Sequence, residues 1–204
     1  MAPPTITRMA PGLAGGHFVF SARAIQIARM TTDLRFPTGR FQAPASYTGA
    51  SRAAAIAAIA ETPSNLRRAV KGLSDEQLDT PYRPDGWTVR QLVHHVPDSH
   101  MNAYIRTRLA LTEDNPTIKP YDEARWAELH DAKSLPVDVS LSMLDAIHER
   151  WVALLKAMTP AQYARTLNHP ERGPMTVDEL VALYQWHGPH HVAHVTGLRS
   201  RMKW

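Results

Sequence analysis

The C-terminal part of the chain carries histidines at a spacing that suits a metal ion. On an α-helix, residues four apart lie one turn above each other on the same face, so their imidazoles can reach a single ion. Two pairs have this spacing, His187 with His191 and His190 with His194. The alternative for either pair is a set of core or surface histidines hydrogen-bonded to neighbouring groups. The spacing predicts a metal site and leaves the choice of pair open.

The apolar pattern of the same segment distinguishes the two pairs. At about 100° per residue, large apolar side chains gather on one side of the expected helix: Leu180, Tyr184, Val195 and Leu198. His187 and His191 lie nearest the centre of this side, whereas His190 and His194 lie at its edge. Unpaired imidazoles on a buried face lose hydration, and a shared cation is one way to offset that loss. The pattern therefore favours His187 and His191.

A catalytic metal site needs a third protein ligand and an open position. The candidates are His94, His95 and His100, which lie in a second segment with a helical pattern. Periodicity places His100 nearest the apolar centre, with His94 and His95 flanking it, so it does not choose among them. The chain contains no cysteine, so a transition metal would be held by histidine and carboxylate ligands.

Four long helical patterns are available to position these histidines. They cover approximately residues 51–73, 88–112, 137–158 and 176–201, with shorter helices expected at 74–77, at 123–130 and from 160. Capping boxes mark several helix starts, such as Thr88 with Gln91 and Thr176 with Glu179. No alternating strand pattern of useful length appears. The sequence therefore predicts an all-α fold built as a four-helix bundle, whose core is a usual place for metal sites.

Composition excludes several classes of function. A chain of 204 residues is long enough for one domain with a sizeable core. The formal net charge of +4 comes from dispersed arginines mixed with acidic residues, which indicates a solvated surface and no nucleic-acid groove. No apolar run of about 18 residues exists, so no membrane span is expected. The lack of cysteine is compatible with a reducing compartment, and we expect a cytoplasmic protein.

The first 29 residues differ from the rest of the chain. They contain three arginines and no acidic residue, and the first acidic residue is Asp33. Their apolar stretch at 17–20 is too short for the core of a secretory signal. We expect residues 1–29 to be a disordered extension, or to precede a natural start at Met30, and residues 30–204 to form the metal-binding domain. Within that domain, prolines and glycines at 30–50 predict an extended arm laid over the helices.

Several segments resemble the DinB/YfiT-like family, specifically its YfiT-like group. They are residues 82–102, 111–123, 183–187 and 190–194, together with the pair Arg150 and Trp151. The resemblance implies an up-and-down four-helix bundle, commonly a homodimer, that holds one divalent ion on three histidines. It implies His95 as the first ligand, because that histidine directly precedes an apolar residue in the second helix. The other two ligands match His187 and His191, in agreement with the apolar pattern.

The resemblance also bears on the neighbours of these three histidines. It leaves His94 and His190 beside the site, with Asp98 or His148 as partners that could orient an imidazole. Pro97 and Pro189 depart from the family pattern. Each removes a backbone donor within its helix, so each is expected to kink that helix beside the metal and to leave the site more open.

Three neutral imidazoles and a fourth position for water suit Zn²⁺, with Ni²⁺, Fe²⁺ or Mn²⁺ as alternatives. Such an ion can lower the pKa of a bound water, or it can ionise an incoming thiol. The resemblance therefore implies a metal-dependent hydrolase. The first alternative is a thiol S-transferase that conjugates a low-molecular-weight, bacillithiol-like thiol to electrophiles. The second is a non-enzymatic interaction protein whose metal only staples the bundle.

The second helix offers polar groups for either reaction. Asp98 lies three residues from His95 and is a candidate general base for hydrolysis; a kink at Pro97 would change the direction of its side chain. Asn102, Arg106 and Arg108 are candidates for binding the polar body of a thiol cofactor, and either arginine can hold a carboxylate. We expect a small-molecule substrate, and neither a nucleic acid nor a membrane as partner.

Overall fold

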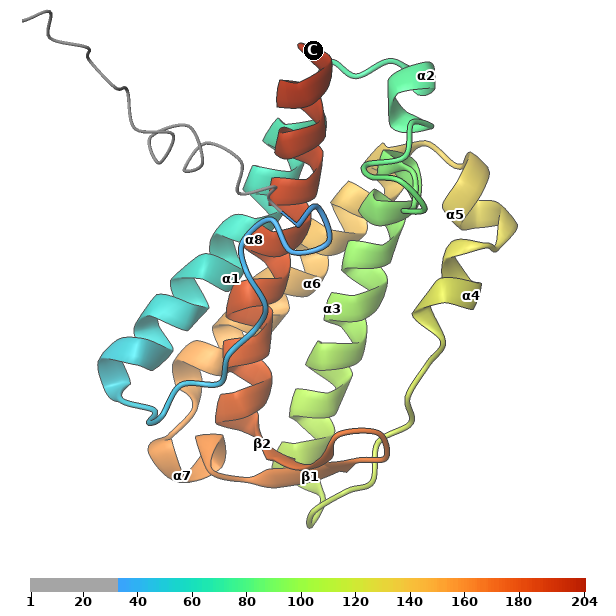
Figure 1. Ribbon diagram of the computed structural model, residues 1–204. Helices are drawn as coiled ribbons and strands as arrows, with labels where there is room; N and C mark the ends of the chain where they lie inside the picture. Colours follow the sequence, from blue (N-terminus) through green and yellow to red (C-terminus); the bar gives the residue numbers. More distant parts are fainter. Residues whose placement is uncertain (1–32) are drawn as a thin grey trace, which may run out of the picture. The chain divides into compact units, whose positions relative to one another are not determined.

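The structure is a computed structural model that describes residues 33–204 (Figure 1). The extension expected at residues 1–29 lies outside the described residues. The long helices are α1 (Gly49–Val70), α3 (Val89–Thr112), α6 (Val137–Ala157) and α8 (Val177–Met202). The short helices are α2 (Asp75–Leu78), α4 (Glu123–Ala127), α5 (His130–Ser134) and α7 (Pro160–Tyr163). None of the helices in this part of the chain is long and apolar enough to cross a membrane.

Local sequence explains where these helices begin. The side chains of Thr88 and Thr176 each accept a hydrogen bond from the backbone amide of the residue three positions later. The side chains of Gln91 and Glu179 in turn accept a hydrogen bond from the backbone amide of the threonine. Both capping boxes were expected, and both satisfy amides that the first helical turn leaves unpaired. The segment expected as one helix at 123–130 is instead two short helices, α4 and α5.

A two-stranded hairpin interrupts the all-helical pattern. Strand β1 (Thr166–His169) pairs antiparallel with β2 (Gly173–Thr176), and Leu167 lies opposite Met175. Gly173 has a φ of 80°, a conformation that favours glycine at the turn. The sequence did not indicate this hairpin, because strands of four residues are too short for a periodic signal. The predicted all-α class is otherwise confirmed.

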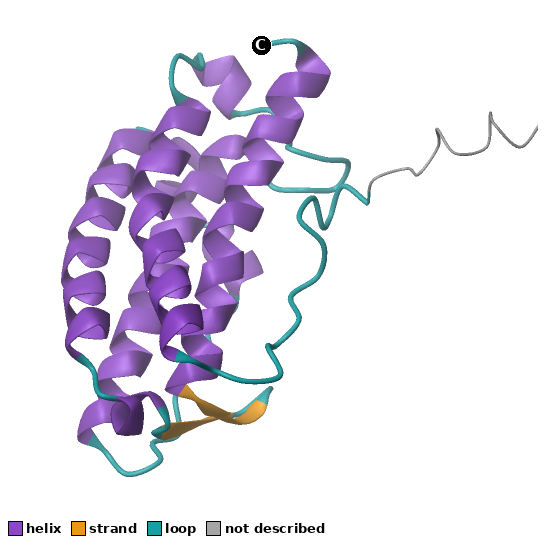
Figure 2. Ribbon diagram, turned by 90° about the vertical axis from the view of Figure 1, so that its left-hand side faces the viewer, coloured by secondary structure: helices purple, strands orange, loops and turns teal. Residues whose placement is uncertain are grey.

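The predicted four-helix bundle is also confirmed (Figure 2). Its four long helices do not simply alternate in direction along the chain, as the expected up-and-down order implies. Helix α1 packs mainly against α8, and α3 packs mainly against α6. The N-terminal ends of α1 and α8 meet at the Arg52–Asp178 ion pair, and those of α3 and α6 meet at the His94–Ser140 hydrogen bond. Within each of these pairs the helices are therefore parallel, because the long connection carrying α4 and α5 returns the chain to the end where α3 began.

Two apolar clusters fill the bundle, one toward each end. The cluster nearer the hairpin includes Ile59, Trp151 and Leu180, and the cluster at the other end includes Leu92 and Leu144; all five are at most 1% exposed. A layer of buried histidines lies between them along the helices. Burial of such large side chains stabilises each helix in place by about 1.5–3 kcal/mol per residue. The two clusters thereby fix the rotation of the helices that carry the histidines.

The segment before α1 lies along α8, as expected for an extended arm. Between Asp33 and Thr48 the chain forms no helix or strand before the cap of α1. The indole nitrogen of Trp186 donates a hydrogen bond to the carbonyl oxygen of Gly39 over 3.0 Å. Phe36 lies against the ring of His190, with ring centroids 6.2 Å apart.

Three prolines lie inside long helices that continue through them. They are Pro63 in α1, Pro97 in α3 and Pro189 in α8. Each lacks the amide hydrogen that would bond the carbonyl four residues earlier. Beside Pro189, Gly188 allows α8 to approach α1 closely, because a Cβ at this position would lie 2.3 Å from the hydroxyl oxygen of Thr62.

Candidate metal centre

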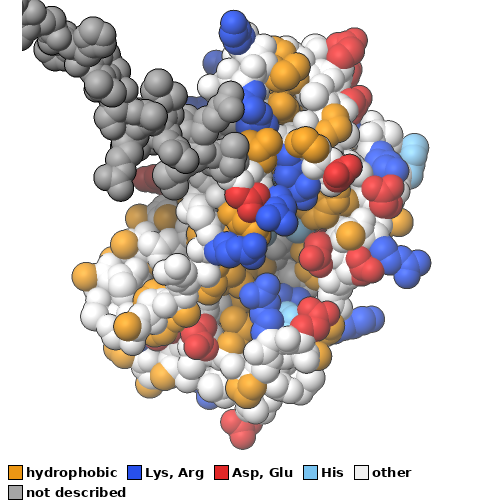
Figure 3. All heavy atoms as spheres, viewed as in Figure 1, with side chains coloured by type: hydrophobic (Ala, Val, Ile, Leu, Met, Phe, Trp, Pro, Cys, Tyr) orange, Lys and Arg blue, Asp and Glu red, His pale blue; other side chains and the backbone are white. Residues whose placement is uncertain are grey.

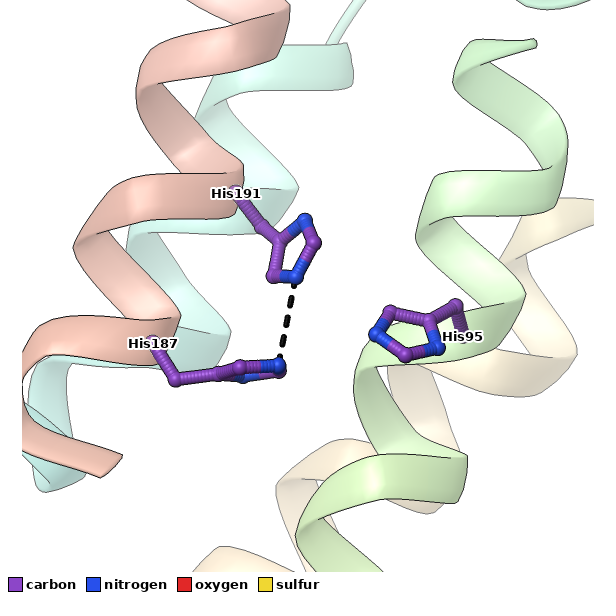
Figure 4. Close-up of side chains that lie close together, drawn as sticks. All are labelled: His95, His187 and His191. Carbon is purple, nitrogen blue, oxygen red and sulfur yellow. Dashed lines mark hydrogen bonds between the residues drawn. The ribbon is translucent and has the colours of Figure 1, made fainter. Parts of the chain in front are cut away.

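Three histidines from two helices converge on one point. One ring nitrogen from each of His95, His187 and His191 lies within 4.8 Å of the other two (Figure 4). The Nε2 atoms of His187 and His191 are 3.2 Å apart. His95 approaches from α3, and its ring centroid lies 5.0 Å from that of His191 and 5.6 Å from that of His187. The structure thus brings together the residues that the sequence and the resemblance predicted.

These imidazoles lie in a setting that keeps them neutral. Burial lowers the pKa of His95 from 6.5 to about 4. Burial also holds the pKa values of His187 and His191 well below 6.5, and the neighbouring histidines lower them further. A neutral imidazole keeps one unprotonated nitrogen, which is the form that binds a metal. The three residues are therefore ready as ligands at neutral pH.

The hydrogen bonds of the cluster leave some ring nitrogens without a partner. Within residues 33–204, His95 makes no hydrogen bond, and the buried Nδ1 of His191 has no partner. His187, by contrast, is held through Nδ1, which lies 3.1 Å from Nε2 of His100. Buried polar atoms without partners are rare because they lose their hydration. The pattern is that of a site completed by a further group.

An open cavity of about 540 Å³ gives access to the cluster. Aromatic side chains line it, among them Trp87, Tyr121 and Trp186, and Trp87 packs against His95 with ring centroids 4.7 Å apart. Charged residues also line it: Arg35, Arg83, Asp85, Arg106, Glu123, Glu171 and Arg172. Figure 3 shows basic side chains, interspersed with acidic ones, along the centre of this face. The size suits a small molecule, since ligand pockets commonly span about 300–1,000 Å³.

The second histidine pair is arranged in a similar way but lacks a third ligand. The Nε2 atoms of His190 and His194 are 3.1 Å apart. Among the described residues, no further histidine or carboxylate joins them in a cluster of metal-ligand geometry. Trp186 stacks on His190 with ring centroids 4.2 Å apart, and Thr38 lies within hydrogen-bond distance of its Nδ1. The choice of His187 and His191 over this pair agrees with the geometry.

The remaining histidine candidates have other partners. His94 bonds Ser140 over 2.7 Å and the carbonyl oxygen of Leu135 over 3.1 Å, and it does not line the cavity. His100 lies between His187 and His148, with 2.8 Å between its Nδ1 and Nε2 of His148. His148 was considered as a direct partner of a ligand. In the structure it reaches His187 only through His100.

The polar candidates of the second helix separate clearly. Asp98 does not line the cavity and forms no hydrogen bond with His95; its backbone carbonyl accepts a hydrogen bond from the side chain of Asn102. The exposed Arg108 donates to the hydroxyl of Tyr104. Only Arg106 lines the cavity, where it is 9% exposed. The structure therefore brings one of these four residues together with the three histidines.

Several residues of the cavity were not among those predicted from the sequence. Arg172 lies in the hairpin turn, which had no periodic signal, although the following Gly173 marked a turn. Ser99 and Tyr184 bond each other over 3.0 Å, and the hydroxyl of Ser99 lies 3.4 Å from Nε2 of His187. Tyr184 was assigned to the apolar stripe, where it does lie. Its hydroxyl additionally donates to the backbone carbonyl of Ser99.

Comparison with known proteins gives consistent matches. The family model of the DinB superfamily matches residues 58–195. A Bacillus mycoides protein named "Putative metal-dependent hydrolase" is 56% identical over 172 residues, which cover 84% of this chain and 99% of that protein. A Bacillus cereus protein with that name is 55% identical over the same coverage. The structure of Bacillus subtilis YfiT, described as "a probable metal-dependent hydrolase with an unusual four-helix bundle topology", is similar with a TM-score of 0.82 and 45% identity, covering 84% of this chain and 98% of that one.

Proposed function

This chain belongs to the DinB superfamily, and on that premise we propose that it is a metal-dependent hydrolase whose divalent ion is bound by His95, His187 and His191. One observation carries the proposal. Three neutral imidazoles converge from two helices at the wall of a cavity large enough for a small-molecule substrate. A site with three protein ligands keeps a position for a further ligand, which is the arrangement of catalytic sites.

The residues present fit such an ion. Nitrogen ligands about 2.0–2.1 Å from a tetrahedral zinc ion lie about 3.3 Å apart. The Nε2 atoms of His187 and His191 are 3.2 Å apart, close to that separation. His95 makes no hydrogen bond within residues 33–204, so a ring nitrogen of this third imidazole is also available to the ion. An all-imidazole ligand set favours Zn²⁺ first, with Ni²⁺, Fe²⁺ and Mn²⁺ as further candidates.

When bound, the ion supplies a Lewis acid that can activate water for hydrolysis. The surrounding residues shape the cavity and hold the ligand rings in place. Trp87 packs against His95 and restricts the rotation of its ring. The hydroxyls of Tyr184 and Ser99 are hydrogen-bonded to each other beside His187, and both residues line the cavity. These contacts fix the ligands before any substrate arrives, which lowers the reorganisation needed for reaction.

The proposal is tested by turnover with and without metal. Purified protein is stripped with a chelator, reloaded with Zn²⁺, and assayed with a panel of small esters and amides. We expect metal-dependent hydrolysis that is lost in His187→Ala and kept in His194→Ala, the matched histidine of the second pair. A parallel arm offers a chlorodinitrobenzene electrophile with low-molecular-weight thiols. Conjugation without hydrolysis of any ester or amide would favour the thiol S-transferase instead.

We further propose that Arg106 binds an anionic group of the substrate. Its guanidinium is buried at the cavity, and within residues 33–204 no carboxylate lies within 4 Å of it. Nη2 donates to the backbone carbonyl of Lys119, whereas the buried Nε has no acceptor. An unpaired buried charge is costly, so a ligand carboxylate or phosphate would find a preformed partner here. Arg172 adds a second positive charge to the same cavity.

The role of Arg106 is tested by binding that does not depend on turnover. Benzoate and inorganic phosphate are titrated into metal-free protein and followed by NMR, which also separates carboxylate from phosphate binding. In Arg106→Gln we expect the affinity for the preferred anion to fall about tenfold or more, because a charge-assisted hydrogen bond is lost. Arg108→Gln is the control, since Arg108 is exposed and bonded to Tyr104. Equal affinities in the two variants would contradict the assignment.

Two broader properties complete the proposal. We propose a homodimer, as the resemblance to the family implies, and light scattering coupled to gel filtration tests it. We propose a cytoplasmic location, because the chain has no cysteine and therefore does not need an oxidising compartment for disulfide formation. Cell fractionation with an antibody against the protein tests this second point.

A further inference from the structure

Four groups form a line of hydrogen bonds across the bundle, one from each long helix; three of them are buried and the fourth, His187, is half-buried. The Nδ1 atom of His148 in α6 lies 2.7 Å from the carbonyl oxygen of Ile59 in α1. The Nε2 atom of His148 lies 2.8 Å from Nδ1 of His100 in α3. The Nε2 atom of His100 lies 3.1 Å from Nδ1 of His187 in α8. We call this line the histidine relay.

The first member of the relay is a carbonyl that has lost its helical donor. In a regular helix, the carbonyl of Ile59 would accept from the amide four residues later. That residue is Pro63, which has no amide hydrogen. The carbonyl is buried, since Ile59 is 0% exposed, so it needs another donor. His148 supplies that donor from the neighbouring helix.

The carbonyl of Ile59 sets the direction of every bond in the relay. A carbonyl oxygen only accepts, so Nδ1 of His148 carries the hydrogen. Burial lowers the pKa of His148 to about 4, so its ring is neutral and its Nε2 is an acceptor. Nδ1 of His100 must then donate, and Nε2 of His100 must accept from Nδ1 of His187. The bonds therefore run in one direction, from His187 toward Ile59.

This direction determines which nitrogen of His187 is free. With the hydrogen on Nδ1, the Nε2 atom of His187 is unprotonated. Nε2 is also the atom that lies 3.2 Å from Nε2 of His191. If His187 carried its hydrogen on Nε2 instead, two bare nitrogens would face each other between His187 and His100. The relay thus excludes the tautomer that could not bind a metal at this point.

We propose that His100 and His148 are positioning residues of the metal centre, which hold the ring of His187 in the orientation and tautomer that present Nε2 to the ion. This inference rests on the proposed role of His187 as a ligand. Metal-bound histidines usually donate their other N–H to a carboxylate, a carbonyl or water. Here two further histidines stand between the ligand and the carbonyl, so a backbone group of α1 controls a ligand on α8.

The direct test is the tautomer of each ring in the metal-free protein. Long-range ¹⁵N–¹H NMR distinguishes the nitrogen that carries the hydrogen from the one that does not. We expect His100, His148 and His187 all to carry it on Nδ1. In His148→Leu, His100 loses its acceptor, so we expect the Nε2-protonated form to appear at His100 and the single tautomer of His187 to be lost. A hydrogen on Nε2 of His187 in the unaltered protein would overturn the inference.

The second test is the affinity for Zn²⁺, measured by competition with a chromophoric chelator. We expect His148→Leu to weaken binding about 10–100-fold, as for other residues that orient a ligand. His148→Gln, which can still accept from His100, should restore part of the affinity. His94→Leu is the control, because His94 is also buried and bonded to a backbone carbonyl but has no link to His187.

Folding is monitored separately, by urea unfolding of the metal-free variants, and affinities are compared only among folded proteins. Wild-type affinity in a folded His148→Leu variant would overturn the positioning role. If the unaltered protein binds no Zn²⁺ at all, the proposed metal site itself fails. The tautomers would then still report whether the relay runs in the stated direction, so the two failures are distinguishable.

Discussion

The Nε2 atoms of His187 and His191 lie 3.2 Å apart, one helical turn from each other on α8. The same helix holds a second pair, His190 and His194, at 3.1 Å. The two pairs have the same spacing and nearly the same separation, yet within residues 33–204 only the first lies opposite a histidine of another helix. This difference, and not the spacing, makes the first pair a candidate metal centre.

Metal content should separate the two pairs. We expect about one divalent ion per chain in the unaltered protein and a loss of most of it in His187→Ala and in His191→Ala, because two imidazoles bind an ion much more weakly than three. His194→Ala should keep its metal. Elemental analysis by mass spectrometry after dialysis measures each content. Full occupancy in both ligand variants would rule out the assignment.

Close packing at Gly188 should make this position intolerant of a side chain. In Gly188→Ala the new methyl group would lie 2.3 Å from the hydroxyl oxygen of Thr62, so the helices must separate. We expect a loss of about 2 kcal/mol in the free energy of unfolding, measured in urea. Gly197→Ala on the same helix is the control: its nearest neighbour is the end of Arg201 at 3.4 Å, so no loss is expected.

A double variant shows whether the contact with Thr62 is the cause. Thr62→Ala removes the two atoms nearest to the new methyl group and leaves its Cβ at 3.0 Å. Combined with Gly188→Ala, it should recover part of the lost stability. Strictly additive effects of the two substitutions would indicate that the destabilisation arises elsewhere.

Asp98 should reduce stability at neutral pH. Burial, followed by the charge of Asp131, raises the pKa of this carboxyl from 3.8 to about 6. A carboxyl with a raised pKa binds more protons in the folded state than in the unfolded state, so stability falls as pH rises through this range. We expect Asp98→Asn to increase the free energy of unfolding by about 1 kcal/mol at pH 7.5, allowing for solvent screening, and by less at pH 5. Urea titrations at both pH values measure the difference, and a larger gain at pH 5 would contradict the sign.

Shortening the N-terminus should reveal where the domain begins. The sequence of residues 1–29 has no apolar period with which to join the bundle, so a protein starting at Met30 should keep its melting temperature and metal content. A protein starting at residue 43 should melt at a lower temperature. It lacks Phe36, and Trp186 loses the carbonyl of Gly39 as an acceptor. Equal melting temperatures for both truncations would show that the arm adds no stability.

Much of the fold could be predicted because its signals are local. Helix starts follow from capping boxes such as Thr88 with Gln91, where the whole motif spans four residues. The hairpin could not be predicted, because its four-residue strands lack a period. The parallel arrangement of α3 and α6 was also out of reach. It depends on where the connection through α4 and α5 ends, and the amphipathic pattern of a helix does not contain its direction.

For the site, the pair His187 and His191 could be predicted from the sequence, because residues four apart on one helix meet through local geometry and the apolar stripe shows which side is buried. It did not choose among His94, His95 and His100, and the resemblance to a family was needed to name His95. The folded chain shows that His95 faces the pair, that His94 bonds the carbonyl of Leu135, and that His100 links His187 to His148. These outcomes depend on how α3 is rotated about its axis relative to α6 and α8. That rotation is set by the packing of side chains from all four long helices, so no single segment of the sequence contains it.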